Sequence, residues 1–158
     1  MTMNPKQFPQ RKSPRLQGYD YSQAGAYFVS ICAHQRQLLF GTIQNGQLKY
    51  EALGQIVHDI WQTIPQHKST VELDYFVVMP NHFHGILILG DNSPKLGTIV
   101  GHFKAAVTRI ANRQLQYETR IWQDRYYDNI IRNEQMLNTI RQYVISNLAK
   151  WNEDEFYL

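Results

Sequence analysis

The sequence has only one cysteine, Cys32, so no disulfide can form within the chain. A single cysteine in an apolar run is typical of a small buried side chain in a reducing compartment, and it disfavours a secreted scaffold held together by disulfides. Apolar runs are also short. None reaches the roughly 18 residues that a membrane span requires, and the polar N-terminal stretch lacks the apolar core of a signal peptide. We therefore expect a cytoplasmic protein that does not insert into a membrane.

Internal repeats and low-complexity tracts are absent, and the net charge is small. The 16 Lys and Arg residues and 13 Asp and Glu residues give a formal charge of +3. Three acids lie together at Glu153, Asp154 and Glu155, so the rest of the chain is more basic. With 158 residues, 43% of them apolar and 13% aromatic, the chain can bury one sizeable core. We predict a basic, proline-containing arm over residues 1–23 and a single domain over residues 24–158.

Hydrophobic periodicity and turn residues indicate where the helices and strands lie. Alternating or β-branched apolar runs are typical of strands, whereas apolar residues three and four positions apart mark one face of a helix. The expected strands cover residues 26–33, 38–43, 47–50, 71–79, 82–89 and, as a short element, 120–123. The expected helices cover residues 51–66, 96–116 and 134–150, and residues 126–132 are expected to form a loop or a helical turn. Asn45-Gly46 predicts a hairpin turn, and Asn133 predicts the N-cap of the last helix.

This order of elements predicts an α+β fold. Its helices would pack on one face of a largely antiparallel sheet, and ferredoxin-like topology accounts best for the alternation of strands and helices.

The stretch YFVVMPNHFHGILIL, residues 75–89, carries the most suggestive chemistry. Two strand-like runs meet at a Pro-Asn turn followed by His82, Phe83 and His84. Side chains alternate along a strand, so the two imidazoles point to the same face, about 6.6 Å apart along the backbone. Such a pair suits a shared metal ion. The alternative is two histidines on a half-exposed strand, satisfied by water or by the backbone.

A second pair of polar residues lies in the expected last helix. Tyr143 and Asn147 are four residues apart, so both lie on one edge of the apolar stripe, separated by about 6 Å of helical rise. Both side chains can then face one point on a neighbouring sheet. On spacing alone, a boundary tyrosine with a polar neighbour is the preferred explanation of the pair.

Basic residues concentrate in two segments, and their distribution is compatible with phosphate contacts. The residues predicted to bind DNA are Arg11, Lys12 and Arg15 of the arm and Lys104, Arg109 and Arg113 of the expected second helix. Ordinary solvated charge is the alternative.

Four blocks of the sequence, in this order, resemble the HUH-superfamily tyrosine transposases, in particular the small REP-associated, IS200-like group. The blocks are RKSPRLQGYDYSQAGAYFVSI, VVMPNHFHGILIL, GTIVGHFKAAVTRI and IWQDRYYDNIIRNEQMLNTIRQYVISNLAKW, and together they span most of the chain. The resemblance implies a DNA strand transferase that acts on single-stranded or hairpin DNA. Cleavage and rejoining would pass through a 5′-phosphotyrosine link, which conserves the bond for religation.

The resemblance also implies roles for individual residues. His82 and His84 take the positions of the two metal-binding histidines, Tyr143 that of the nucleophile, and Asn147 that of a polar third ligand. The implied ion is Mg²⁺ or Mn²⁺, although imidazole ligands would also suit zinc. Family members often have Asn-Pro where this chain has Asn-Leu at positions 147–148, so the last helix is expected to continue further here.

Several alternatives stay open at the level of sequence. Tyr126 and Tyr127 compete with Tyr143 as nucleophile, but neither is followed by an amide four residues later, and stacking on unpaired bases suits them better. A non-catalytic nucleic-acid-binding module would need none of these site residues, and a metal hydrolase would be indifferent to Tyr143. The site can assemble within one chain or between two, so the chain is expected to be a monomer or a homodimer.

Overall fold

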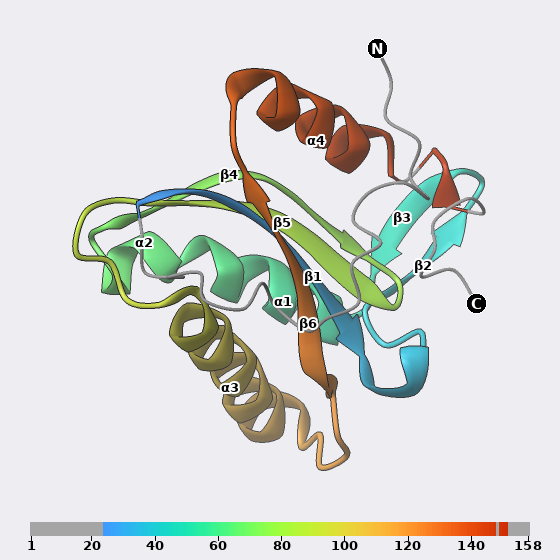
Figure 1. The fold of residues 1–158 in the computed structure, drawn as a ribbon. Helices are drawn as coiled ribbons and strands as arrows, with labels where there is room; N and C mark the ends of the chain where they lie inside the picture. Colours follow the sequence, from blue (N-terminus) through green and yellow to red (C-terminus); the bar gives the residue numbers. More distant parts are fainter. Residues whose placement is uncertain (1–23, 148, 152–158) are drawn as a thin grey trace.

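A four-stranded antiparallel sheet in the order β4-β5-β1-β6 forms the centre of the fold (Figure 1). The computed structural model describes residues 24–147 and 149–151. The strands are β1 (Gly25–Ala33), β4 (Val71–Met79), β5 (His82–Leu89) and β6 (Trp122–Ile131). Because β5 lies between β1 and β4, and β1 lies between β5 and β6, the sheet has the split β-α-β arrangement of ferredoxin-like folds. The predicted fold class is confirmed.

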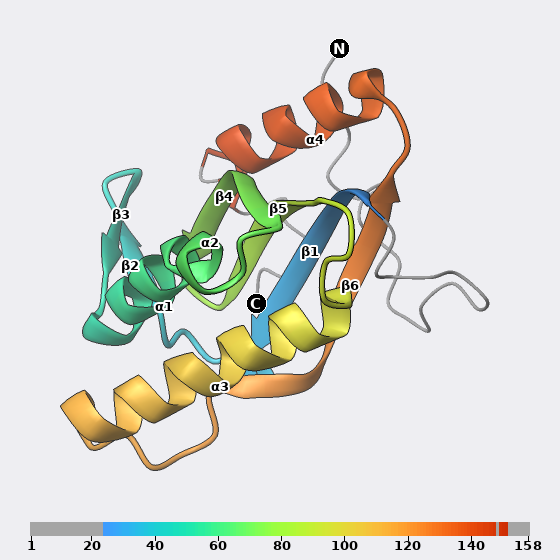
Figure 2. The same cartoon turned by 90° about the vertical axis from the view of Figure 1, so that its left-hand side faces the viewer.

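Helices lie on both faces of this sheet (Figure 2). One face carries α1 (Ala52–Gln62), the short α2 (Ile64–His67) and α3 (Leu96–Leu115), as expected for the helices that connect the strands. The other face carries α4 (Glu134–Ser146), which buries a smaller apolar cluster of its own. The last helix therefore adds a layer to the predicted arrangement, and the residues of the candidate site lie between this layer and the sheet.

The two-residue period of β5 divides its side chains between the two layers. Phe83 and Leu87 belong to the larger core under α1 and α3, whereas Ile86 packs toward α4. Gly85 is required by close packing, because a Cβ at this position would lie 2.7 Å from Cζ2 of Trp61. Trp61 is fully buried. Truncating it to alanine is expected to destabilise the fold by about 3–5 kcal/mol.

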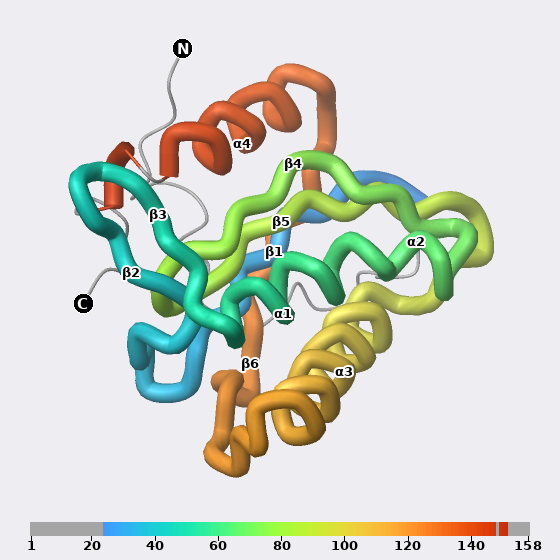
Figure 3. Tube along the Cα trace, turned by 180° about the vertical axis from the view of Figure 1, so that it is seen from behind, coloured from blue at the N-terminus to red at the C-terminus, as the bar shows by residue number. Residues whose placement is uncertain are grey.

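The strands β2 (Gly41–Gln44) and β3 (Gln47–Tyr50) form a separate hairpin. Asn45 and Gly46 have φ angles of 53° and 75°, as a type I′ turn requires. The predicted hairpin is confirmed, although its first strand begins three residues later than expected, after the 3-10 helix η1 (His34–Arg36). The hairpin projects beyond the sheet, near the C-terminal end of α4 (Figure 3).

One predicted element was wrong. Residues 122–131 form the continuous strand β6, where a short strand and a loop or helical turn were expected. β6 is an edge strand that pairs with β1, with a register shift between Ile31 and Ala33. Its polar residues, including the buried Asp128, obscure the apolar alternation that identifies a strand in a sequence.

Two helix boundaries also differ from the prediction. The expected helix over residues 51–66 is divided after Gln62, and Pro65 lies in the first turn of α2, where a missing N–H is tolerated. The last helix ends at Ser146, with Asn147 as its C-cap, so it is shorter than expected.

Candidate metal and nucleophile centre

The alternation of β5 places His82 and His84 on the face that α4 covers. Both side chains are fully buried, and their ring centroids are 4.6 Å apart. The predicted pairing of the imidazoles on one face is therefore what the structure has. Within residues 24–147 and 149–151, no group of three His, Cys, Asp or Glu side chains is placed to hold a metal ion. Among the described residues, a third donor at this pair would therefore be of another residue type.

Asn81 fixes the orientation of the first imidazole. The Nδ1 atom of His82 lies 2.7 Å from Oδ1 of Asn81, and both residues are fully buried. An amide oxygen can only accept, so Nδ1 carries the proton and Nε2 keeps its lone pair in the neutral ring. This is the tautomer that coordinates a metal through Nε2. Sequence reasoning treated Asn81 only as a turn residue.

Ser30 and Phe28 of β1 hold the second imidazole. The β1–β5 register pairs Ser30 with His84, and the serine Oγ lies 2.7 Å from Nδ1 of His84. Phe28 stacks on the same ring, with centroids 5.4 Å apart and planes at 23°. Neither residue was predicted from the sequence. Their roles depend on the sheet register, which no local pattern shows.

Helix α4 brings Tyr143 to the histidines. The helix begins at Asn133, whose side chain accepts a hydrogen bond from the amide of Met136, so the predicted N-cap is confirmed. Tyr143 is 2% exposed, and its hydroxyl lies 3.4 Å from Nε2 of His84. The phenol ring meets Phe28 edge-on, with centroids 6.0 Å apart. A tyrosine oxygen and the histidine pair thus share one buried space within a single chain.

Asn147 lies one turn beyond Tyr143 and is 2% exposed. Its Oδ1 atom is buried and has no hydrogen-bond partner among the described residues. An unpaired buried amide oxygen is costly, by about 1–3 kcal/mol, so such an atom usually marks a site that another group completes.

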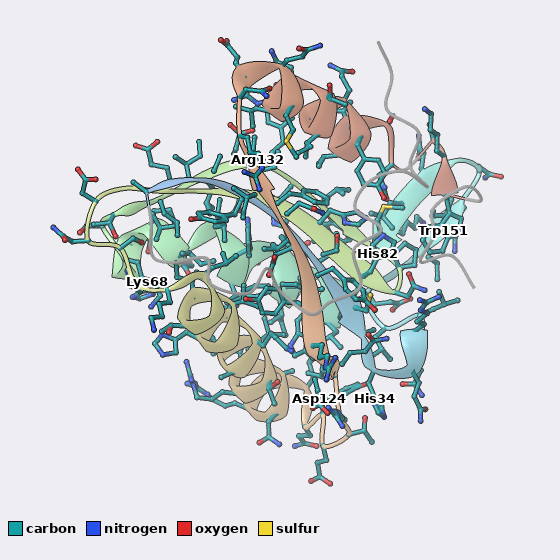
Figure 4. All side chains as sticks on the ribbon, in the orientation of Figure 1. His34, Lys68, His82, Asp124, Arg132 and Trp151 are labelled. Carbon is teal, nitrogen blue, oxygen red and sulfur yellow. The ribbon has the colours of Figure 1, made fainter. Side chains whose placement is uncertain are left out.

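Trp151 closes the site on the side of His82. The two rings are nearly parallel, with an interplanar angle of 9° and centroids 6.0 Å apart. Figure 4 labels His82 and Trp151, which lie near the C-terminal end of α4.

The predicted basic residues of α3 lie away from this centre. Arg109 and Arg113 are exposed on α3, which packs on the opposite face of the sheet. Lys104 is half-buried, and its role in DNA binding stays a prediction. Its ammonium group donates to the backbone oxygens of Gln123 (2.6 Å) and Asp124 (3.3 Å), and burial lowers its pKa. The arm residues Arg11, Lys12 and Arg15 lie outside the described part of the chain.

The two competing tyrosines are both on β6, on opposite faces of the sheet. Tyr126 packs against the larger core under α3, whereas Tyr127 is in register with Ser30.

No described helix is long and apolar enough to cross a membrane.

Comparison with known proteins identifies the family. The model of the family described as "Transposase IS200 like" matches residues 21–147, which include every element from β1 to α4. The chain belongs to the IS200-like transposase family. An uncharacterised protein of Haemophilus influenzae is 34% identical over 169 residues, covering 94% of this chain and 93% of that protein.

A solved structure has the same fold. The structure of a REP-associated tyrosine transposase bound to a REP hairpin superposes with a TM-score of 0.68 at 19% sequence identity. The match covers 89% of this chain and 76% of that protein. At this identity the likeness shows the fold, and the roles of individual residues rest on the geometry of this chain.

Proposed function

We propose that this IS200-like transposase cleaves and rejoins single-stranded DNA beside a hairpin through a covalent link to Tyr143. The observation that carries the proposal is the position of the Tyr143 hydroxyl, 3.4 Å from Nε2 of His84, whose ring in turn lies beside that of His82. Asn147 is buried one turn further along the chain from Tyr143. A non-catalytic binding module has no need for this combination. Hairpin DNA is chosen as substrate because the REP-associated transposase of the same fold is bound to one.

The side chains of His82, His84 and Asn147 have the donor atoms that a divalent ion needs. Two imidazoles whose Nδ1 atoms contact Asn81 and Ser30 can present Nε2 to a common position, and the Oδ1 atom of Asn147 supplies a buried oxygen that has no partner among the described residues. We propose that His82, His84 and Asn147 hold Mg²⁺ or Mn²⁺. A bound ion of this kind acts as a Lewis acid that neutralises the charge of the phosphate.

The tyrosine then supplies the covalent chemistry. Its oxygen forms a bond to phosphorus, the bond between phosphorus and the 3′ oxygen breaks, and the 5′ phosphate stays on Tyr143. The phenolic proton leaves to water, and the released 3′ oxygen takes up a proton. Attack by a 3′ hydroxyl on the phosphotyrosine reverses the step and joins a strand. A phenol with a pKa near 10 is a poor nucleophile at neutral pH, so positioning must supply much of the rate.

We propose that a single chain completes this site; the meeting of the described histidines with the tyrosine in one chain supports this. Activity is therefore expected to be proportional to protein concentration, whether the chain is a monomer or a homodimer.

The proposal is tested by incubating the protein with a hairpin oligonucleotide that has a single-stranded flank and a label on the 3′ side of the cleavage site. In Mg²⁺ or Mn²⁺, cleavage should be accompanied by a labelled protein band under denaturing conditions. EDTA should abolish both signals. Cleavage without a protein-linked product would instead indicate a water-based nuclease, and binding without cleavage would indicate a binding module.

A further inference from the structure

A two-point ion pair joins the tyrosine helix to the edge of the sheet. Nε of Arg141 donates to Oδ1 of Asp74 at 2.8 Å, and a terminal nitrogen donates to Oδ2 at 2.6 Å. The aspartate side chain is 10% exposed and that of the arginine 31%. Arg141 also donates to Asn138 at 3.2 Å, and its guanidinium carbon lies 5.4 Å from the centroid of the Tyr75 ring. Partly buried bidentate pairs are stronger and more directional than ordinary surface pairs.

The backbone of β4 is shaped to present this aspartate. The β4–β5 register shifts between Leu73 and Phe76, and both of these side chains pack against the larger core. Asp74 and Tyr75 are therefore the bulged residues between two inward-facing positions. The carboxylate of Asp74 also accepts a hydrogen bond from the amide of Tyr75 at 2.8 Å. Bulges re-aim side chains and are frequent beside active sites.

The position of this pair on α4 matters for Tyr143. Arg141 and Tyr143 are two residues apart, so they project to different sides of the helix, one toward the edge of β4 and one toward β1 and β5. Among the described residues, α4 is also attached through the smaller apolar cluster around Phe28, Ile86 and Ile140 and through the contact of Tyr143 with His84. Apolar contacts are not directional, so they resist rotation of a helix weakly. A rotation of about 20° would move a tyrosine hydroxyl by ~3 Å, and a misplacement of about 1 Å is enough to lower a rate ~100-fold.

We infer that the β4 bulge and Arg141 form a clasp that sets the rotation of α4 and thereby positions the Tyr143 hydroxyl against His84. Arg141 and Asp74 are positioning residues, since neither touches the reacting atoms. The functional part of this inference rests on the proposed role of Tyr143 as nucleophile. Its structural part, the attachment of α4 through the clasp, does not.

The structural part is tested by amide hydrogen exchange of the full chain without DNA. Asp74→Ala and Arg141→Ala should each accelerate exchange in residues 134–147 by about tenfold, with little change in β5. The double variant should match Arg141→Ala, because that change already removes the ion pair together with the contacts to Asn138 and Tyr75. Asp59→Ala is the matched control, since it removes a carboxylate that is 60% exposed on α1. Unchanged exchange in α4, or additive effects of the two substitutions, would overturn the clasp.

The functional part is tested at saturating hairpin DNA. Arg141→Ala should lower the rate of covalent attachment at least tenfold while leaving the dissociation constant for DNA nearly unchanged, at a temperature where the variant is still fully folded. Arg141→Lys, which keeps the charge but loses the bidentate geometry, should restore only part of the rate. Full activity of Arg141→Ala, or full restoration by Arg141→Lys, would overturn the positioning role. If the wild-type protein formed no adduct, the proposed function would fail, and the exchange experiment would still decide whether the clasp exists.

Discussion

The hydroxyl of Tyr143 and the imidazole of His84 come from segments 59 residues apart, yet the structure places their oxygen and Nε2 atoms 3.4 Å apart. Strand β5 holds the histidine and helix α4 holds the tyrosine, with Phe28 of β1 in contact with both rings. The proposed activity depends on this junction between sheet and helix.

Ser30 is expected to support the metal position. Ser30→Ala removes the hydroxyl that lies 2.7 Å from the His84 Nδ1 atom in a fully buried site, so we expect a loss of about 1–3 kcal/mol in the free energy of unfolding. Loss of a contact to a metal-bound histidine typically weakens metal affinity by about 10–100-fold. Calorimetric titration with Mn²⁺ and chemical unfolding measure the two effects. Ser69→Ala, at an exposed turn, is the control. Unchanged Mn²⁺ affinity in Ser30→Ala would contradict the proposed ligand role of His84.

The exposed arginines of α3 are expected to contribute to DNA affinity through phosphate contacts. Arg109→Glu combined with Arg113→Glu should weaken hairpin binding and reduce the slope of log K against log salt by roughly 2. Measurements of affinity from about 50 to 200 mM salt test this.

Lys104→Met is the informative comparison for that experiment, because it also removes a positive charge. In the wild type, the ammonium group of Lys104 donates to the carbonyls of Gln123 and Asp124, so the variant should lose thermal stability. Its DNA affinity should change less than that of the double arginine variant. Equal affinity for the double arginine variant and the wild type would show that the DNA lies elsewhere.

The clasp is expected to make stability depend on acid pH. Arg141 lowers the pKa of Asp74 through hydrogen bonds in the folded state, from an ordinary value of 3.8. A lowered folded-state pKa stabilises the protein above the unfolded-state value, and the stabilisation is lost as pH falls through the lower, folded-state value. A hydrogen bond from the amide of Tyr75 also lowers the pKa of Asp74, while burial raises it. On the other partner, the hydrogen bond to Asp74 raises the pKa of Arg141, and the charge of Glu134 helps to raise it.

Chemical unfolding at several pH values measures this dependence against Asp74→Asn, which cannot titrate. The wild type should be more stable than the variant from pH 7 down to about pH 4, and the difference should shrink below that value. A constant difference down to about pH 2 would show that the ionised carboxylate does not contribute.

Much of the fold and the candidate site could be predicted from the sequence, for local reasons. The strict period of two puts His82 and His84 on one face, and the four-residue spacing puts Tyr143 and Asn147 on one edge of a helix. Asn45-Gly46 and Asn133 have turn and cap chemistry that depends only on neighbouring residues. These features need no knowledge of the rest of the chain.

The features that escaped prediction depend on long-range pairing. Ser30 reaches His84 only because β1 and β5 are neighbours in one register. The clasp needs a bulge in β4 and a helix on the second face of the sheet, and neither has a local pattern. Lys104 has the sequence context of a surface cation, but the start of β6 lies beside it and supplies two carbonyl acceptors. Edge strand β6 itself was missed because its polar residues weaken the alternation.

The central claim is that the oxygen of Tyr143 attacks the DNA, and Tyr143→Phe tests it most directly. The substitution removes one hydroxyl and keeps the ring that packs against Phe28. Wild-type protein and the variant are compared for covalent attachment to labelled hairpin DNA in Mn²⁺, with folding and DNA affinity measured alongside. We predict that the variant folds and binds DNA as the wild type does, while strand cleavage and the protein–DNA adduct disappear together. Continued cleavage by the phenylalanine variant, with activity lost only when His82 or His84 is replaced, would contradict the claim.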